Sequence, residues 1–526
     1  MQHSKKNKLL IFISATFLLL LQGCSQNLTV ATHTELKVID PIWTTSYITR
    51  NHGYLVYDTL FSMNEMFEPE PQMVDSWSAT NNNKKWAFQL RDGLNWHDGS
   101  AVTAEDCVAS LKRWGQRDGE GQLLFKNIES IAAVDSKTFV IKLKKSNELI
   151  PNILAKLSTN VPFMMPKHIA ETDAFTAIKD PMGSGPYIFK KNEWVPGKKA
   201  VYIKNENYVP RKEPKSLTSG SKEARLDRIE WRVFKTQEAA LDALVLGDVD
   251  YIESPSTKLI PLVEGKKGIE IGFNDPLGNI AMIRFNTLLP PFDDVEVRRA
   301  VLKAIDQKDY MSAAMGDSQK FWRTCYSVFA CGTEFESDAG NAVMKVADIK
   351  AAKSALKNSN YDGTPVVILN PTDSPTISEY TKVTAEKLRQ IGMSVNVQDM
   401  TWAELTERRA SKEAAKNGGW NIFHTWWIAE DMNNPMSIVF SGNGEQGWYG
   451  WPQDNQLEQY RAEYAQAMTR NVQKKIADKI QTRLYEIAAL GVLGQFFEPV
   501  IYRTKLKGVS APVPLFGNMS LEKEEE

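Results

Sequence analysis

Strand-like and helix-like patterns alternate along this chain of 526 residues, and that alternation limits its fold more than any other feature. Apolar residues occupy every second position of Lys85–Leu90, a period that predicts a half-buried strand. In the segment 237–253 they recur at helical spacing until Gly247, where a glycine predicts the helix end. Another helical segment starts at Asp293, with Glu296 as the partner of a capping box. No internal repeat interrupts the alternation, so we predict an α/β protein.

The first residues indicate export. Three lysines precede Leu9–Leu21, an uncharged apolar run with the length of a signal-peptide core, short for a membrane span. The run ends in Leu-Gln-Gly-Cys, which resembles a bacterial lipobox. We therefore expect residues 1–23 to be a signal peptide and Cys24 to carry a lipid, which tethers an extracytoplasmic protein to the membrane. An uncleaved anchor with a chance cysteine is the alternative.

Net charge argues against a nucleic-acid partner. The chain has 63 lysines and arginines against 64 acidic residues, and removal of the leader takes away lysines but no acid. Nucleic-acid binding requires a concentrated basic surface, which this balance does not provide. The overall composition, with 42% hydrophobic and 10% aromatic residues, is that of an ordinary globular protein.

The cysteines outside the lipobox suggest one local disulfide. Cys325 and Cys331 flank five residues, and in an oxidising compartment their closeness favours a bond between them. Cys107 lies on the apolar side of an expected helix and is predicted to be a buried thiol. Pairing of Cys107 with either of the other two remains an alternative.

Turn chemistry explains the pair His97–Asp98, which taken alone suggests a metal or proton-transfer site. Aspartate–glycine pairs at 92–93 and 98–99 predict turns, and Thr103 predicts the capped start of a helix. The pair therefore lies at a strand-to-helix corner. The other histidines are scattered and the sequence has no HExxH or paired CxxC motif, so we predict no metal site.

No catalytic motif stands out either. The segment 183–186, Gly-Ser-Gly-Pro, lacks the third glycine of a dinucleotide-binding fingerprint and predicts a tight turn. The sequence has no GxxxxGK[ST] or GxSxG motif. We expect no enzyme activity and no cofactor, and any ATP hydrolysis must come from a partner.

The corner after residue 90 belongs to a longer resemblance. The segment Ser76–Trp114 is similar to the signature segment of the peptide/nickel class of bacterial extracellular solute-binding proteins, the receptors of ABC importers. Other segments match in the family's order, among them PMGSGPYIF, FNTLLPPFDDVEVRRAVLKAID and WWIAEDMNNP. The resemblance extends from about residue 28 to about residue 510.

This resemblance implies a bilobal, hinged periplasmic-binding-protein-like fold that closes over its ligand, with the first lobe split into two subdomains. The chain is expected to cross between lobes near 278–286 and 490–503. It implies ABC permease subunits as partners, and we expect the chain to act as a monomer. The expected boundaries are lobe I (subdomain Ia) at 24–50, 170–280 and 495–526, subdomain Ib at 51–169, and lobe II at 281–494.

Aromatic density marks the candidate ligand site. Six of the 14 tryptophans fall within fifty residues, and ligand clefts favour aromatic linings. They are Trp402, Trp420, Trp426, Trp427, Trp448 and Trp451. Asn421–Trp427 predicts a strand, on which Trp426 and Trp427 point to opposite faces, so that one packs in a core while the other faces a cleft. The alternative places both in cores.

The resemblance adds a charged residue to this site. In peptide-binding relatives, an aspartate four residues before the proline of this loop holds the ligand's ammonium group, and counting back from Pro435 gives Asp431. The spacing from Trp427 is one residue longer than in the family, which makes Glu430 a rival. A loop-capping or exposed acid is the alternative for either. Relatives that bind short peptides often have an arginine before this tryptophan, where this chain has His424–Thr425, so recognition of a free carboxylate is not predicted.

The first lobe is expected to contribute hydroxyl groups. Thr44, Thr45, Ser46 and Tyr47 stand where the family's first strand meets its helix at the cleft. Two interpretations remain open: these hydroxyls bond the ligand, or they cap the helix.

Our functional hypothesis is a receptor for peptides or peptide-like cations. A receptor for sugars or other non-peptide solutes is the alternative, since tryptophans also suit sugar faces. A sensor or chaperone on the same fold is another, because a fold does not determine a function.

Overall fold

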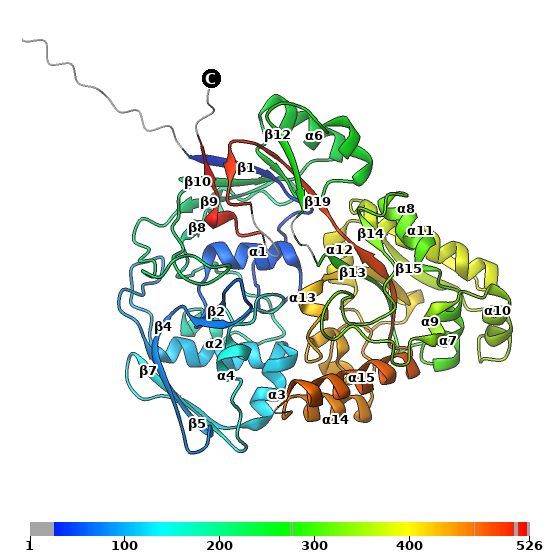
Figure 1. Ribbon diagram of the computed structural model, residues 1–526, viewed down its shortest axis with the longest axis horizontal. Helices are drawn as coiled ribbons and strands as arrows, with labels where there is room; N and C mark the ends of the chain where they lie inside the picture. The colour runs from blue at the N-terminus through cyan, green and yellow to red at the C-terminus, as the bar shows by residue number, and fades with distance from the viewer. Residues whose placement is uncertain (1–25, 274, 276, 468, 510–513, 523–526) are drawn as a thin grey trace, which may run out of the picture.

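The computed structural model describes residues 26–273, 275, 277–467, 469–509 and 514–522. The expected signal peptide and Cys24 lie outside the described residues. The strands form three large sheets in separate regions of the molecule, at the top, the lower left and the right of Figure 1. Two small hairpins accompany them: β2 (Phe61–Met63) with β3 (Pro69–Pro71), and β20 (Leu506–Lys507) with β21 (Ser520–Leu521). The predicted α/β class is confirmed.

The first sheet has seven strands in the order β12-β19-β11-β1-β10-β9-β8. Their bounds are β1 Asn27–Ala31, β8 Tyr187–Phe189, β9 Lys199–Lys204, β10 Arg228–Arg232, β11 Tyr251–Ile252, β12 Ile269–Phe273 and β19 Pro499–Arg503. β1 runs parallel to both of its neighbours, and the other pairs are antiparallel. Helices α1 (Tyr47–Val56) and α6 (Gln237–Leu246) lie near this sheet in Figure 1.

The second sheet is antiparallel, in the order β4-β5-β7-β6. Its bounds are β4 Val74–Thr80, β5 Lys85–Leu90, β6 Ile128–Ala133 and β7 Thr138–Leu143. β5 has the predicted bounds and buries its alternate positions, as the period of two requires. Helix α2 (Ala104–Arg117) packs against β6 and β7, and Thr103 caps it in a reciprocal capping box.

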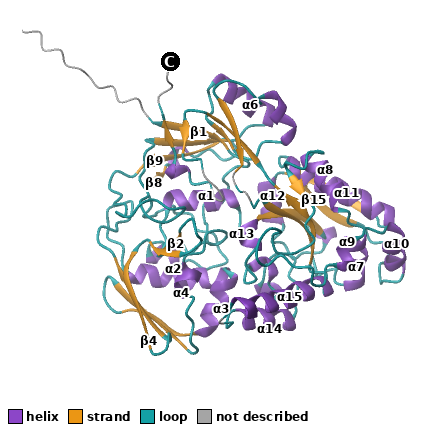
Figure 2. Cartoon of the chain, in the orientation of Figure 1, coloured by secondary structure: helices purple, strands orange, loops and turns teal. Residues whose placement is uncertain are grey.

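The third sheet has the order β14-β18-β13-β17-β15-β16. Its bounds are β13 Asn279–Phe285, β14 Trp322–Arg323, β15 Val366–Pro371, β16 Val395–Met400, β17 Ile422–Ile428 and β18 Leu490–Phe496. β13 and β18 are buried along their whole length. Figure 2 shows helices gathered around this sheet, and the strands at its centre are apolar because both faces are covered.

The remaining helices complete the two cores. Their bounds are α3 Gly119–Asn127, α4 Ile150–Leu154, α5 Lys167–Ala170, α7 Val295–Lys303, α8 Gln307–Met315, α9 Ala342–Lys345, α10 Ile349–Lys357, α11 Pro375–Ile391, α12 Trp402–Arg408, α13 Ala429–Met432, α14 Asn455–Tyr464 and α15 Arg470–Glu486. One large apolar cluster surrounds the six-stranded sheet and extends to α6 and part of the seven-stranded sheet, and a second joins the rest of the seven-stranded sheet to the four-stranded sheet. The molecule therefore has two hydrophobic centres.

The chain passes twice between the seven-stranded and the six-stranded sheet. One link follows β12 and the other follows β18. Phe273 pairs with Pro499 on one side, and Asn279 pairs with Phe496 on the other. The two links consequently begin and end next to each other.

Several local predictions agree with the structure, whereas the strand predicted at Asn421–Trp427 and one helix start are each displaced by one residue. Gly247 ends α6 with a φ of 89°, which suits glycine. Cys325 and Cys331 form the predicted disulfide, with Cα atoms 5.8 Å apart, and Cys107 is a buried free thiol. The expected start at Asp293 is one residue early, because it is Asp294 whose carboxylate accepts the backbone N–H of Glu296 and caps α7.

Candidate functional site

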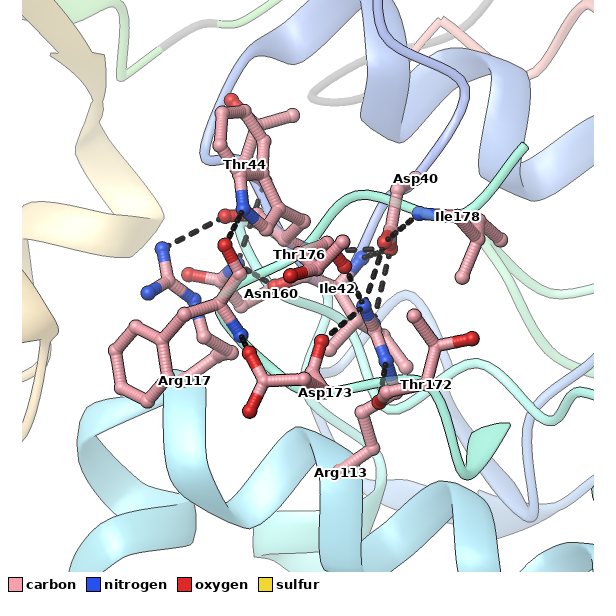
Figure 3. A network of polar contacts seen from close by, with 12 residues as sticks. Asp40, Ile42, Thr44, Arg113, Arg117, Asn160, Thr172, Asp173, Thr176 and Ile178 are labelled. Carbon is pink, nitrogen blue, oxygen red and sulfur yellow. Dashed lines mark hydrogen bonds and ion pairs between the residues drawn. The ribbon is translucent and has the colours of Figure 1, made fainter. Parts of the chain in front are cut away.

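We call the part with the seven-stranded and four-stranded sheets the first lobe and the part with the six-stranded sheet the second. A buried polar network fixes the loop of the first lobe that leads into α1. Arg113 of α2 forms an ion pair with Asp40 at 2.8 Å, and both side chains are almost fully buried. The same Asp40 carboxylate accepts the backbone N–H groups of Ile42 and Ile178. Asn160 donates to the carbonyl oxygen of Thr44 (Figure 3). The loop is thereby held from several directions before it enters α1.

Tyr47, the first residue of α1, contacts the other lobe directly. Its hydroxyl accepts the Ile428 N–H at 2.7 Å and donates to a carboxylate oxygen of Asp431 at 3.0 Å. Its ring stacks on Trp426 with centroids 5.0 Å apart, and the Arg50 guanidinium lies over the ring at 4.3 Å. The predicted residues Tyr47, Trp426 and Asp431 thus form one cluster.

Asp431 is a buried carboxylate without an ion pair among the described residues. It is 6% exposed, and besides Tyr47 it accepts a hydrogen bond from the Thr159 hydroxyl at 3.2 Å. Burial raises the pKa of this carboxyl, while the more distant charges of Lys156 and Arg50 act in the opposite direction. Lys156 itself is paired with Asp118. A negative charge here gains from any cation that approaches closely.

Glu430 occupies a different environment. One of its carboxylate oxygens is buried without a hydrogen-bond partner. Burial and the neighbouring Asp275 raise its pKa well above the ordinary value, because two carboxylates close together disfavour a second charge. Glu430 is therefore a poorer acceptor for a cation than Asp431.

The tryptophan-rich segment lines a small cavity of about 60 Å³ between the lobes. Trp426 is half-buried, whereas Trp427 is 2% exposed and packs against Trp448 with ring centroids 5.1 Å apart. Trp427 is therefore the core residue of the pair and Trp426 the more exposed one, as the strand alternation predicts, although both border the cavity. Trp402 and Trp448 also line it, together with Thr45, Ser46 and Tyr47 of the first lobe. Trp420 and Trp451 lie in the core.

The hydroxyl-bearing residues at 44–46 have different roles. Ser46 is the N-cap of α1, and no side chain caps the helix. The Thr44 hydroxyl accepts the Ser46 N–H at 3.3 Å and supports the turn. The Thr45 hydroxyl instead points across the interface, where it accepts from Arg409 and from the Trp448 indole, each at 3.4 Å.

Arg409 was not predicted from the sequence. It follows α12, is 2% exposed and lines the small cavity. Nothing in its local pattern distinguishes it from the adjacent Arg408, since only the three-dimensional structure shows which of the two is turned inward. Thr159 and Asp275 were missed for the same reason.

A larger cavity of about 650 Å³ lies on the other side of Asp431. Helices α3 and α4 line one wall, and residues after β17 line the other. Its lining mixes apolar side chains such as Leu123 and Met436 with Lys156 and Glu120. Its volume falls within the range of small-molecule sites, roughly 300–1,000 Å³. Asp431 and Tyr47 therefore lie between two spaces, one narrow and aromatic, one wide and mixed.

His97 and His424 each bond to nearby groups of the protein. His97 contacts the Gly185 carbonyl oxygen through its ring at 3.1 Å and donates its backbone N–H to Gly183, which joins two turns far from the cavity. His424 lies between the hydroxyls of Thr381 and Thr384, and burial lowers its pKa to about 3. It is neutral at physiological pH.

Two absences concern only the part of the chain that the structure describes. Those residues contain no group of three or more histidine, cysteine or acidic side chains that is suited to hold a metal ion. None of the helices formed by them has the length and apolar character required to cross a membrane.

Comparison with known proteins shows that this chain is similar to solute-binding proteins. Residues 68–450 match the model of the family described as bacterial extracellular solute-binding proteins, family 5. The chain is 35% identical over 490 residues to a probable peptide ABC transporter periplasmic-binding protein of Sinorhizobium fredii, with 92% of each chain covered. Two solved structures share the fold, which confirms the predicted bilobal architecture.

The first of these is a periplasmic binding protein of A. tumefaciens R10 in complex with agropinic acid. It has a TM-score of 0.77 and 19% identity, and the match covers 95% of this chain and 99% of the other. The second is the binding protein DppA of Helicobacter pylori in complex with a peptide. Its TM-score is 0.78 at 19% identity, with 95% and 98% covered.

Proposed function

This chain belongs to the bacterial extracellular solute-binding proteins of family 5, and on that premise we propose that it captures a peptide or peptide-like ligand between its lobes and delivers it to an ABC permease. The family consists of extracytoplasmic solute-binding transport proteins. The ligand promotes closure only to the extent that it binds the closed arrangement more tightly than the open one.

The observation that supports this proposal best is the unpaired charge of Asp431. Its carboxylate is buried between the lobes and accepts hydrogen bonds from neutral hydroxyls, while no described cation pairs with it. A ligand ammonium group would supply the missing charge and form strong, charge-assisted hydrogen bonds. Glu430 is the poorer candidate because its neighbour Asp275 favours its protonated form.

The aromatic and hydroxyl groups around Asp431 suit the rest of a peptide. Trp426 and the edge of Trp427 offer apolar surface from one lobe, and Tyr47 and Thr45 offer hydroxyls from the other. Thr44 supports this segment from behind. A ligand that contacts both lobes stabilises their approach.

Attachment and assembly complete the proposal. Cys24 carries a lipid after removal of residues 1–23, the mature protein acts as a monomer without catalytic activity, and the lipid is its only contact with the membrane. Cys24→Ala should release the protein from the membrane fraction or leave the precursor unprocessed. Unchanged processing and retention would contradict this part.

A non-peptide solute is the second candidate. It is favoured by the tryptophan-rich cavity, because flat aromatic faces suit sugar rings as well as peptides. The A. tumefaciens protein in complex with agropinic acid shows that proteins of this fold bind such molecules.

The test compares a pool of dipeptides with the same dipeptides N-acetylated, using mass spectrometry of intact complexes and tryptophan fluorescence. The wild type should prefer the free amines, and Asp431→Asn should lose about 2–5 kcal/mol of binding free energy for them. Glu430→Gln is the matched control and should retain the preference. Equal binding of free and acetylated peptides by the wild type would reject the ammonium site. If Glu430→Gln alone loses the preference, the two acids have been assigned to the wrong roles.

A further inference from the structure

Arg409 is a buried cation for which no described residue provides a counter-ion. Its side chain is 2% exposed. The hydrogen bond from Nη2 to the Thr45 hydroxyl is long, at 3.4 Å, and Nε is buried without a partner. A guanidinium has five N–H donors in a planar fork. Most of this donor capacity is therefore not used by the protein.

Other buried arginines of this molecule have an ion pair or several hydrogen bonds to backbone carbonyls, although Nη2 of Arg284 also lacks a partner. Arg113 is paired with Asp40. Arg284 donates to the carbonyl oxygens of Tyr449, Val439 and Ala489, and Arg298 donates to several carbonyls around α7. Among the described residues, neither Arg284 nor Arg298 has a carboxylate partner, but several backbone carbonyls offset the cost of burying each charge. Arg409 has a single long hydrogen bond to the protein, and this difference requires a separate explanation.

Aromatic rings hold Arg409 in place without occupying its donors. The centre of its guanidinium lies 4.8 Å from the Tyr449 ring centroid and 5.5 Å from that of Trp448, with Trp402 and Phe423 slightly farther away. Contacts of a cation with aromatic faces are favourable, and they leave the N–H edge free. Burial lowers the pKa of Arg409 to about 10, so the group stays charged at neutral pH.

Two donors converge at the same point of the interface. Arg409 Nη2 and the Trp448 indole N–H both approach the Thr45 hydroxyl oxygen at 3.4 Å. These bonds are longer than the usual 2.9–3.0 Å. Arg409, Trp448 and Thr45 all line the small cavity, and Ser46 adds another hydroxyl. Such a cluster suits a planar oxyanion, which accepts two parallel bonds from a guanidinium.

We propose that Arg409 is an anion-binding residue of the cleft and that it takes a carboxylate group of the ligand. This inference rests on the proposed function, which assigns the ligand's ammonium group to Asp431. Tyr47 connects the two positions, because it lines the cavity of Arg409 and its hydroxyl bonds to Asp431. The ligand is therefore a zwitterion. Arg409 thereby takes the role for which the sequence predicted no residue near His424–Thr425.

The experiment measures the affinities of a neutral dipeptide, Met-Leu, as the free acid and as its C-terminal amide, with gluconate as a non-peptide acid. The wild type should bind the free acid roughly 30-fold or more tightly than the amide. Arg409→Met should remove this difference, and Arg409→Lys should restore part of it, because a lysine keeps the charge but not the planar fork.

Arg408→Met is the matched control for a neighbouring arginine. Arg408 donates to the Gly418 and Gly419 carbonyl oxygens at 2.9 Å, so its loss should lower the unfolding midpoint and leave the acid preference intact. Arg409→Met should keep or raise the unfolding midpoint, because it removes an unpaired buried charge. A strong loss of stability in Arg409→Met would show a structural role and overturn the inference.

The remaining outcomes separate this inference from the proposed function. If the wild type binds gluconate but neither form of the dipeptide, and Arg409→Met abolishes gluconate binding, the anion site stands while the peptide proposal fails. If acid and amide bind the wild type equally, or Arg409→Met keeps the preference, the anion site is rejected while Asp431 is unaffected. Failure of both acids to bind the wild type also rejects it.

Discussion

Two buried polar regions of this molecule treat charge in opposite ways. In the network behind the cleft, Arg113 and Asp40 pair with each other, and further hydrogen bonds come from or go to the backbone. In the cleft, Asp431 and Arg409 are equally buried, yet neither forms an ion pair with another described residue. In the first region the charged groups pair with each other. In the second they line the cavities between the lobes.

The difference separates residues that stabilise the fold from residues that recognise a ligand. A buried ion pair with complete hydrogen bonding specifies one arrangement of its loop, and removing one partner is strongly destabilising. An unpaired buried charge lowers stability in exchange for affinity. Natural proteins break the rules of polar satisfaction mainly at functional sites.

The largest expected effect concerns the satisfied region. Arg113→Met leaves Asp40 buried without its partner, and we expect the free energy of unfolding to fall by about 3–5 kcal/mol. Chemical denaturation followed by far-UV circular dichroism measures this fall. Arg225→Met serves as the control, because Arg225 and Glu223 form an exposed pair whose loss should cost under about 1 kcal/mol. If Arg113→Met and Arg225→Met lower the free energy of unfolding by similar amounts, the Arg113–Asp40 pair does not stabilise the fold as we describe.

The second prediction concerns Glu498, beside one of the links between the sheets. Burial raises its pKa to about 7, opposed by the Ser254 hydroxyl and His33 and reinforced by Glu253. The folded protein therefore binds a proton that the unfolded chain has released, so this group lowers stability as pH rises from about 4.5 to about 7. Glu498→Gln should remove about 2 kcal/mol of the difference in unfolding free energy between pH 5 and pH 8.

Urea denaturation of the wild type and of Glu498→Gln at both pH values provides the measurement. An identical pH dependence of the two proteins would contradict the raised pKa. A steeper fall of the unfolding free energy with pH in Glu498→Gln would mean that the folded protein lowers the pKa of Glu498 and does not raise it.

The smallest effect concerns His97. Its ring bond to Gly185 joins two turns of the first lobe, so His97→Gln should lower the free energy of unfolding by about 1 kcal/mol. Ligand affinity should stay unchanged, since His97 lines neither interlobe cavity. Loss of ligand binding by a correctly folded His97→Gln variant would show that His97 contributes to ligand recognition.

Local features could be predicted from the sequence because neighbouring residues determine them. The alternation in Lys85–Leu90, the cap at Thr103 and the stop at Gly247 depend on a few positions each. The helix start at Asp293 was wrong by one residue, since two adjacent aspartates compete for one cap. Asp431 was predicted from the family resemblance and not from the local chemistry of its segment.

The rest of the site depends on contacts between distant segments. Tyr47 meets Asp431 across 384 positions of the chain, and Thr45 meets Arg409 across 364. No local pattern contains such information. Arg408 and Arg409 are the same residue type on the same helix end, and only the packing of the lobes decides which one is turned to the cleft.

The paired links between the sheets have a mechanical consequence. Phe273 is paired with Pro499 at one end and Asn279 with Phe496 at the other, so the two links begin and end as neighbouring strands, about 5 Å apart. Two connections anchored side by side at both ends bend together more easily than they twist. We therefore expect the relative motion of the lobes to follow a single angular coordinate, so that one pair of spectroscopic labels, placed far from the links on opposite lobes, reports the whole movement.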